Sequence, residues 1–271
     1  MADYALLVAS PQLSEMKAFS TAFQARYDDL VSGDPLDQWS RRWEYPFALE
    51  AVREHVGRAG GRRCRVLDAG SGFTFFPFLL SEQLEAVVTC VDTSPALEWA
   101  FQRAAGDGYS VEFRLGDVTS PGESPDSSFD VVVCVSVLEH VRAGARDRVL
   151  RELHRLLRPG GLLVLTFDVG VDGDYEIPLR DAEALLANVA GAFPGSPVPG
   201  LGELADAVRG DVLTSRRVAA KEPWRMPWSN RLNATLGSLR HGFLPRSFGF
   251  RNLTVWCGRV LRDAGREAAL G

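Results

Sequence analysis

The stretch Val66-Leu67-Asp68-Ala69-Gly70-Ser71-Gly72-Phe73 constrains the fold more than any other part of the chain. Its apolar start is typical of a buried β-strand, which leads directly into a glycine-rich turn. A helical pattern follows from about Phe75 to Leu84, and a second apolar run, Ala86 to Val91, ends in Asp92. A strand, a glycine turn, a helix and a strand that ends in a carboxylate predict a nucleoside-binding α/β unit.

Strands and helices continue to alternate after Asp92. We expect strands over Val111 to Leu115, Phe129 to Val135 and Leu162 to Phe167, with helices from Ser94 to about Ala105 and from Arg146 to Leu157. Near-continuous β-branched runs are typical of a parallel sheet that is covered on both faces. The alternation therefore predicts a doubly wound α/β sheet with right-handed crossovers.

The two ends of the chain are expected to cover this sheet. Apolar residues between Leu13 and Leu30 recur at helical spacing, Val212 to Ala219 reads as a strand, and Leu253 to Leu261 reads as the last strand. We expect one domain with a helical N-terminal lid over 1–60, a cofactor-binding core over 61–168, an acceptor-binding insertion over 169–250, and the last strand with a tail over 251–271.

The composition limits the classes of partner. The formal net charge of −5 argues against a general binder of nucleic acid, which would need a basic footprint. The start of the chain lacks a basic segment followed by an apolar one, and no apolar run reaches about 18 residues, so we expect a soluble, cytoplasmic protein without membrane contact. Four widely spaced cysteines show no metal-ligand spacing and are expected to be buried free thiols: Cys64, Cys90, Cys134 and Cys257.

Acidic residues stand where successive strands end. Gly70 and Gly72 would let the backbone approach a ligand closely. Asp92 would accept both hydroxyls of an unphosphorylated ribose, and Asp117, after the third strand, would accept from an exocyclic amine such as that of adenine. Asp68 would repel a pyrophosphate but suits a cationic ligand. The alternative is an ordinary α/β fold with acidic strand ends.

Five motifs occur in an order that resembles the class I S-adenosylmethionine-dependent methyltransferases: VLDAGSGF, VDTS, GDV, FDVVVCVSVLEHV and RELHRLLRPGGLLVL. The resemblance covers residues 64–167 and implies a Rossmann-like, seven-stranded, mostly parallel sheet with helices on both faces. One departure is Thr74, which stands where the family usually has a third glycine.

The resemblance also implies residue roles. The methionine part of the cofactor would contact Asp68 and the turn, the ribose would contact the end of the second strand, the adenine would follow the third strand, and the fourth strand would line the cofactor near its methyl group. The implied cofactor-binding residues are Asp68, Gly70, Ser71, Gly72, Phe73, Asp92, Thr93, Asp117, Val118, Cys134, Val135 and Ser136.

Aromatic residues and arginines outside the sheet are further candidates. Arg42, Trp43 and Tyr45 would form a lid over the cofactor, with the arginine on its carboxylate and the aromatic rings near the sulfonium; the alternative is a helix–sheet packing cluster. Residues outside the sheet would also bind the acceptor, although they could instead belong to a small core: Tyr27, Asp168, Tyr175, Trp224 and Trp228.

His140 is the best-placed candidate for a general base if the acceptor is a hydroxyl. The alternative is a histidine at a helix start that is bonded to backbone. Some quinone-pathway methyltransferases carry Glu-x-x-Glu-His here and bind a divalent metal. Because Ser136 occupies the first of those positions, a carboxylate is lost and no metal is expected.

These observations predict an enzyme that transfers the methyl group of S-adenosylmethionine to a small-molecule acceptor, with oxygen as the preferred acceptor atom, in specialised metabolism. The protein would be a monomer or a homodimer. Two alternatives remain open: a nicotinamide-dependent oxidoreductase, and a protein that binds S-adenosylmethionine without catalysis.

Overall fold

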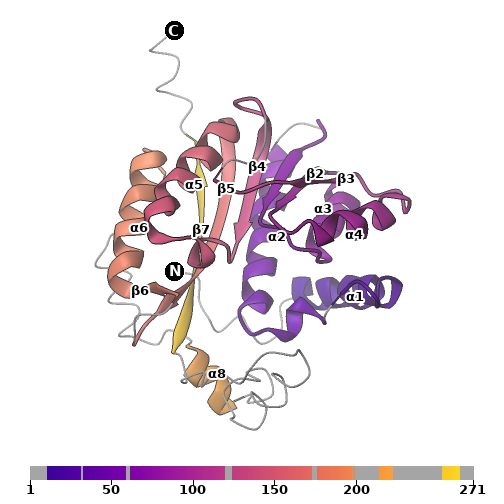
Figure 1. Ribbon diagram of the computed structural model, residues 1–271, viewed down its shortest axis with the longest axis horizontal. Coiled ribbons are helices and arrows are strands. Elements are labelled where there is room, and N and C mark those ends of the chain that lie inside the picture. Colours follow the sequence, from indigo (N-terminus) through magenta and orange to yellow (C-terminus); the bar gives the residue numbers. More distant parts are fainter. Residues whose placement is uncertain are drawn as a thin grey trace.

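The computed structural model describes residues 11–31, 33–58, 62–119, 124–172, 176–196, 198, 214–221 and 252–262. Within these residues the chain forms a seven-stranded sheet with helices on both faces (Figure 1). Its strands are β1 (Arg65–Ala69), β2 (Val87–Asp92), β3 (Val111–Leu115), β4 (Phe129–Val135), β5 (Leu157–Gly170), β6 (Ile177–Pro178) and β7 (Leu253–Leu261).

The strand order is β3-β2-β1-β4-β5-β6, with β7 paired to β5 outside this path. The pairs along the path are parallel, and β7 runs antiparallel to β5. The chain moves outward from β1 to β3 and then returns to β4 on the other side of β1. The crevice at the carboxyl ends of the strands beside such a switch point is where open α/β sheets bind ligands.

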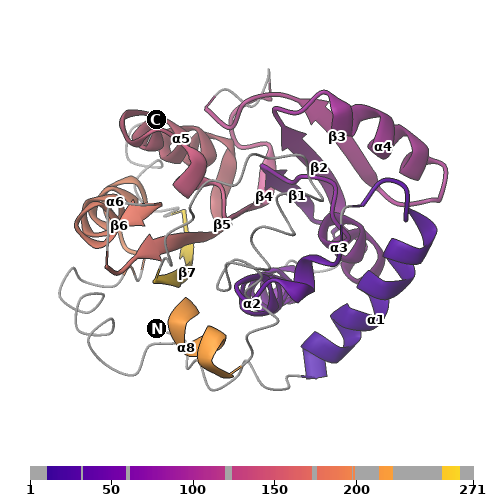
Figure 2. The same ribbon diagram turned by 60° about the horizontal axis from the view of Figure 1, so that its bottom comes forward.

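One group of helices packs on one face of the sheet and a second group packs on the other (Figures 1 and 2). The first group is α1 (Pro11–Arg26), α2 (Arg41–Arg58), α3 (Phe76–Leu84) and α4 (Ala96–Ala105), and the second is α5 (Ala143–Leu156) and α6 (Leu179–Ala192). Short 3₁₀ turns, η2 (Pro35–Asp37) and η3 (Leu138–His140), precede α2 and follow β4. Helix α8 (Ser215–Lys221) packs near β7.

Successive side chains along the strands point to opposite faces of the sheet and so form two hydrophobic cores, one on each face. Val66 of β1 packs with the α1–α4 side, whereas its neighbour Leu67 packs with α5 and α6. The same alternation holds in β4, where Val131 and Val132 face opposite sides. Both faces are therefore apolar, which explains why these strands read as continuous hydrophobic runs.

The structure confirms the Rossmann-like, seven-stranded α/β fold and the helical N-terminal region. The bounds of β3, β4 and β7 coincide with the predicted ones. β5 is longer than predicted at both ends, because Leu157 pairs with Phe129 of β4 and the residues after Phe167 pair with β7. A strand over Val212 to Ala219 is wrong in its described part, since Ser215–Lys221 is helix α8. Thr214 begins that helix: its hydroxyl accepts from the Arg217 amide at 3.4 Å, and its carbonyl accepts from Val218 at 3.0 Å.

Candidate functional site

The glycine turn after β1 is hydrogen-bonded to β2 and lies close to the segment that follows β4. The amides of Gly70 and Ser71 both donate to the carbonyl of Val91, at 2.7 and 3.2 Å. Gly70 has a φ of +78°, and a Cβ on it would lie 2.5 Å from Cγ2 of Val137. The turn therefore requires glycine at this position, both for its left-handed backbone and for the close approach of the segment after β4.

Asp92 at the end of β2 is fixed by the same turn. Its Oδ2 accepts a hydrogen bond from the Gly72 amide at 3.0 Å, and its Oδ1 accepts from the Ser94 amide at 3.0 Å. Gly72 donates this bond from a left-handed conformation, with a φ of +56°. A carboxylate oxygen accepts more than one hydrogen bond, so both oxygens retain capacity for a ligand.

Asp68, in β1, is buried beside this acid. Burial, together with the charge of Asp92, raises the pKa of Asp68 to about 7. The nearby hydroxyl oxygen of Ser71 is buried and has no hydrogen-bond partner among the described residues. An acid that is costly to ionise and an unsatisfied hydroxyl both favour a ligand that brings a cationic hydrogen-bond donor.

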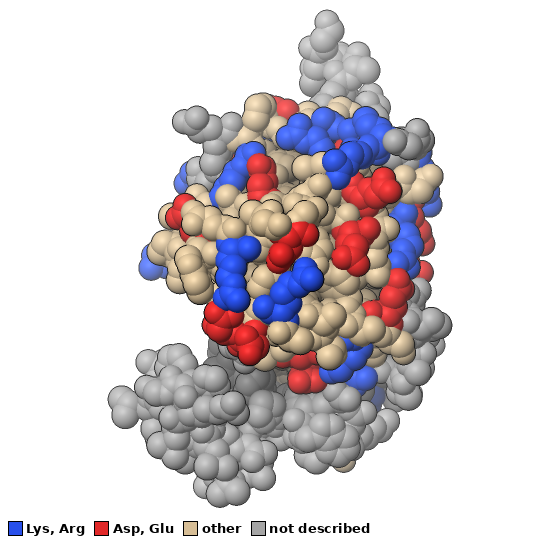
Figure 3. Space-filling model, turned by 90° about the vertical axis from the view of Figure 1, so that its right-hand side faces the viewer, with Lys and Arg blue, Asp and Glu red and all other residues tan. Residues whose placement is uncertain are grey.

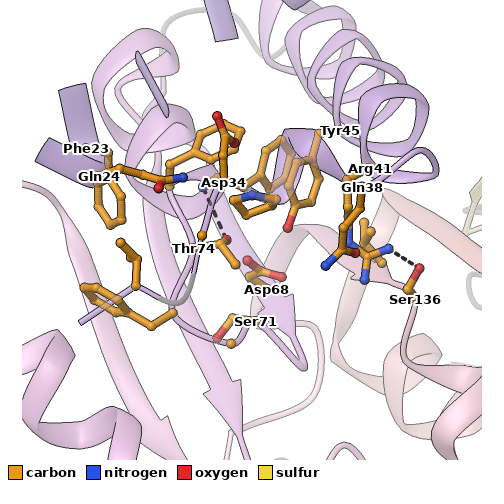
Figure 4. A pocket seen from close by; sticks show the side chains of 18 of the residues that line it. Phe23, Gln24, Asp34, Gln38, Arg41, Tyr45, Asp68, Ser71, Thr74 and Ser136 are labelled. Carbon is orange, nitrogen blue, oxygen red and sulfur yellow. Dashed lines mark hydrogen bonds between the residues drawn. The ribbon is translucent and has the colours of Figure 1, made fainter. Parts of the chain in front are cut away.

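A cavity of about 440 Å³ opens above the turn (Figure 4). Its floor is the end of β1 and its walls come from α1, the loop around η2, and the start of α2. In Figure 4 Asp68 points upward from the sheet, with Tyr45 above it and Arg41 beside Ser136 at one end. The polar lining residues are Gln24, Asp34, Asp37, Gln38, Arg41, Tyr45, Asp68, Ser71, Thr74, Asp92 and Ser136.

One end of the cavity is closed by a buried polar network. Glu44 of α2 is fully buried, and its Oε1 accepts from the hydroxyls of Ser136 at 2.7 Å and Thr166 at 2.6 Å. The guanidinium of Arg41 donates to the other oxygen of Glu44 and to the Ser136 hydroxyl. Burial opposes the charge of Arg41, but Glu44 and Tyr45 outweigh it and raise the pKa of Arg41. The network fixes α2 to the carboxyl ends of β4 and β5.

Nine of the predicted site residues line this cavity, and they come from β1, its turn, β2, β4 and α2: Tyr45, Asp68, Gly70, Ser71, Gly72, Phe73, Asp92, Val135 and Ser136. Three others lie at neighbouring strand ends but not in its lining. Thr93 and Asp117 are exposed, and Val118 is buried in the core. The Gly116 amide donates to the carbonyl of Asp92 at 2.9 Å, which keeps Asp117 next to β2.

The remaining predicted residues lie elsewhere. Cys134 of β4 is fully buried in the core on the α5–α6 side of the sheet. Trp43 stacks on Phe47 with ring centroids 5.4 Å apart, in a small core with Trp39, Val218 and Val255. Arg42 does not line the cavity. For Trp43 the geometry matches the packing alternative.

The candidate base and acceptor residues are also dispersed. His140 is exposed and is not part of the cavity lining, so its role as a base stays a prediction. Tyr27 is buried in an aromatic cluster with Phe23, and its hydroxyl donates to Asp107. Asp168 lies near the end of β5. Tyr175, Trp224 and Trp228 lie outside the described residues.

Sequence reasoning missed Arg41 and Glu44 as well as the loop around η2. Helical spacing gave a signal for Arg41, because residues four apart share one face of a helix and Arg41 precedes Tyr45 by four. The guanidinium of Arg41 lies 5.9 Å from the centroid of the Tyr45 ring. For Glu44 no local signal exists, since its partners Ser136 and Thr166 are distant in the sequence.

The sheet order and a glycine turn between two strand-end acids define a Rossmann-like protein that binds a nucleoside cofactor. Residues 67–165 match the family described as "Methyltransferase domain". The ordered motifs, the fold and this match identify the segment as a class I S-adenosylmethionine-dependent methyltransferase domain.

Curated relatives carry the same domain. The chain is 36% identical over 125 residues to a "Ubiquinone biosynthesis O-methyltransferase" of Xanthomonas euvesicatoria pv. vesicatoria, which covers 45% of this chain and 48% of the relative. It is 32% identical over 136 residues to a protein of the same name from Pseudomonas aeruginosa, covering 47% and 56%. The chain thus spans about half the length of the curated relatives it matches.

A solved structure extends the likeness in fold. Phosphoethanolamine N-methyltransferase 2 of Haemonchus contortus superposes with a TM-score of 0.51 and 16% identity, covering 94% of this chain and 61% of that one. At this identity the likeness shows the fold alone.

The residues in the cavity fit S-adenosylmethionine. Four acids line it, Asp34, Asp37, Asp68 and Asp92, against the single guanidinium of Arg41 among the described lining residues. This balance suits a cofactor with a sulfonium and an ammonium group and one carboxylate. It would repel the pyrophosphate of a dinucleotide, which is usually held by a helix N-terminus free of acids.

Proposed function

We propose that this chain transfers the methyl group of S-adenosylmethionine to a hydroxyl of a small-molecule acceptor. The observation that supports this most strongly is the glycine turn between two strand-end acids, Asp68 and Asp92, under a single arginine from α2. The names of the matched relatives favour oxygen as the acceptor atom.

Each residue would hold one part of the cofactor. Asp92, already oriented by two amides, would accept from the ribose hydroxyls, Asp68 with the Ser71 hydroxyl would hold the ammonium group, and Arg41 would pair with the carboxylate. S-adenosylmethionine would supply a methyl group that its sulfonium already activates. The chain's own work would then be to orient the acceptor and to exclude water.

The N-terminal segment would act as the lid in this proposal, and the segment from 169 to 250 would hold the acceptor. The support for the lid is that α1, the η2 loop and α2 contribute walls of the cavity, as Figure 4 illustrates. The buried Glu44 network would hold the lid on the sheet.

The proposed acceptor is a small molecule of specialised metabolism rather than a nucleic acid. The net charge is −5, and on the face seen in Figure 3 basic side chains are interspersed with acidic ones over much of the surface. Ser136 also departs from the metal-binding pattern of some quinone-pathway methyltransferases. No helix in the described part of the chain is both long and apolar enough to cross a membrane.

The test uses S-adenosylmethionine labelled in its methyl group and a panel of simple phenols, with catechol as the first probe. Transfer of label to the phenol oxygen supports the proposal. Binding of S-adenosylhomocysteine without transfer to any acceptor would favour the non-catalytic alternative, and stabilisation by NADH alone would favour an oxidoreductase.

A further inference from the structure

A further acid, Glu139, lies close to the network of Glu44 and Arg41 that closes one end of the cofactor cavity. Glu139 lies in η3, three residues after Ser136, and it is only 7% exposed. Neither of its carboxyl oxygens has a hydrogen-bond partner among the described residues. The hydroxyl of Ser136 has a single proton, which it donates to Glu44, so it does not serve Glu139.

Asp168, near the carboxyl end of β5, has a second carboxyl group with a buried oxygen that lacks a hydrogen-bond partner among the described residues. It lies on β5, two residues after Thr166, which pairs with Val135 of β4. Its Oδ1 is buried and has no partner in the described part of the chain. Burial raises the pKa of Asp168 well above its ordinary value, and the charges of Glu44 and Glu139 add to the effect.

Among the described residues, the cation that acts on both acids, Arg41, already has hydrogen-bond partners of its own. Arg41 is close enough to both acids to influence them, but its hydrogen bonds go to Glu44 and Ser136. Burial, followed by the charge of Glu44, raises the pKa of Glu139 to about 7. Besides these groups, Glu176 also faces Asp168.

Glu139 and Asp168 differ from Glu44 in their hydrogen-bond partners. Glu44, Glu139 and Asp168 lie near one another at the carboxyl end of the sheet. Glu44 is bonded by two hydroxyls and a guanidinium, whereas both carboxyl oxygens of Glu139 and Oδ1 of Asp168 are buried without a hydrogen-bond partner among the described residues. Leaving buried acceptors unsatisfied costs free energy, and such groups call for an explanation. No group of three or more His, Cys, Asp or Glu side chains in the described residues has an arrangement that could hold a metal ion.

We propose that Glu139 and Asp168 form the acceptor end of the site, where they bind a neutral, hydroxyl-bearing acceptor and Glu139 takes up its proton. This deepens the proposed function and rests on it. In the transfer, the acceptor oxygen forms a bond to the methyl carbon, and the carbon–sulfur bond breaks. Its electron pair stays on sulfur, giving S-adenosylhomocysteine, and the hydroxyl proton passes to the Glu139 carboxylate.

The same pair defines the class of acceptor. Two neighbouring carboxyl groups would accept hydrogen bonds from a phenol but would repel a carboxylate or phosphate. A neutral catechol should therefore be methylated in preference to 3,4-dihydroxybenzoate, which differs from it by one anionic group. Glu139 would also act in place of its exposed neighbour His140.

The first test does not depend on activity. Infrared difference spectra of the complex with S-adenosylhomocysteine, taken between about pH 5 and pH 9, report carboxyl groups that titrate near neutrality. We expect Glu139→Gln to remove one such band and Asp168→Asn to move it to lower pH, because a nearby like charge is lost. Glu50→Gln, the same change on an exposed part of α2, is the control. A band that survives Glu139→Gln unchanged would overturn the proposal.

The second test measures transfer to catechol. We expect Glu139→Gln to lower kcat by about 100-fold or more and to flatten its rise with pH, while the affinity for S-adenosylhomocysteine stays within about twofold of the parent. Wild-type rates with an unchanged pH profile, or equal use of 3,4-dihydroxybenzoate by the parent protein, would contradict the assignment.

The two tests also separate this inference from the proposed function. If the parent protein transfers methyl groups to no phenol, the proposed hydroxyl transfer fails, and the infrared titration still decides whether Glu139 holds a proton near neutrality. If Glu139→Gln does not bind S-adenosylhomocysteine, the infrared titration is made on Asp168→Asn instead, and the predicted shift of the carboxyl band to lower pH is the result to check.

Discussion

The backbone amide of Gly72 donates a hydrogen bond to Oδ2 of Asp92 at 3.0 Å. The bond joins the turn after β1 to the last residue of β2, and the Ser94 amide holds the other oxygen. The carboxylate therefore has a fixed orientation before any ligand binds, which lowers the ordering cost of binding. The turn and the acid act as one unit.

Replacing Asp92 by alanine should weaken the binding of S-adenosylhomocysteine by about 10- to 100-fold. Hydrogen bonds to a charged group contribute about 1.5–3 kcal/mol each, and the substitution removes the ribose acceptor together with the support of the turn. Calorimetric titration measures the change. Glu98→Ala, an exposed acid on α4, is the matched control. An affinity for Asp92→Ala equal to that of the control would refute the ribose assignment.

The two glycines of the turn should differ in their tolerance of alanine. At Gly70 a Cβ would lie 2.5 Å from Val137, whereas at Gly72 the nearest atom within reach is Thr74 Cγ2 at 3.8 Å. We expect Gly70→Ala to lower the free energy of unfolding by about 2–4 kcal/mol, and Gly72→Ala by about 1 kcal/mol, the cost of the left-handed backbone alone.

Denaturant titration checks this difference, and the double variant Gly70→Ala with Val137→Ala isolates its cause. Removing the Val137 methyl groups should restore part of the loss, because the clash is relieved while the backbone strain remains. A double variant whose loss is the sum of the two single losses would show that the close approach is not the reason for glycine.

Arg41 should matter more for the cofactor than its neighbour Arg42. Arg41→Ala removes a cavity-lining guanidinium and leaves the fully buried Glu44 without its charge partner. We expect about a tenfold weaker affinity for S-adenosylhomocysteine and a loss of about 3 kcal/mol in the free energy of unfolding. Calorimetry on both alanine variants decides the matter, and a larger loss of affinity for Arg42→Ala would favour the sequence-based assignment.

Binding should depend on pH through Asp68. Its folded pKa of about 7 lies above the ordinary value of 3.8, so near pH 6 the free protein holds a proton that a bound ammonium group would displace. Affinity for S-adenosylhomocysteine should rise as the pH increases through about 7, changing by about tenfold per unit below the pKa. Titrations in buffers of different ionisation enthalpy would count the released proton, and a pH-independent affinity would contradict the assignment.

The carboxyl group of Asp68 also makes folding stability depend on pH, but in the opposite direction: a rising pH strengthens ligand binding and lowers the stability of the free protein. Because its folded pKa is raised, its contribution to the stability of the free protein is full below about pH 4 and is lost as the pH rises through about 7. Asp68→Asn should therefore make the free protein more stable at pH 8 than the parent while abolishing tight binding. A lower melting temperature for Asp68→Asn at pH 8 would show that the carboxylate is stabilised by contacts other than a ligand.

The fold was largely predictable because its signals are local. β4 is a nearly continuous apolar, β-branched run, β3 alternates apolar and charged residues, and the bounds of β3, β4 and β7 coincide with the prediction. The strand predicted over Val212 to Ala219 was wrong because so few apolar residues fit both the two-residue period of a strand and the 3.6-residue period of a helix. The cap formed by Thr214 favours the helix.

The site was predictable where chemistry and strand ends coincide, as at Asp68, Gly70 and Asp92. It was less predictable where tertiary contacts choose among neighbours. Arg41, rather than Arg42, enters the cavity because of the rotation of α2. Asp168 was a candidate because it follows the predicted fifth strand, whereas Glu139 stands out only because its carboxyl oxygens lack partners among the described residues, a property that depends on how distant segments pack.

The cavity above the glycine turn should bind S-adenosylmethionine and its product rather than a dinucleotide. Calorimetric titration of the parent protein and of Asp92→Ala with S-adenosylhomocysteine and with NADH tests this prediction most directly. We predict saturable one-to-one binding of S-adenosylhomocysteine that Asp92→Ala weakens strongly, and no binding of NADH. Saturable binding of NADH to the parent protein, without binding of S-adenosylhomocysteine, would contradict the account.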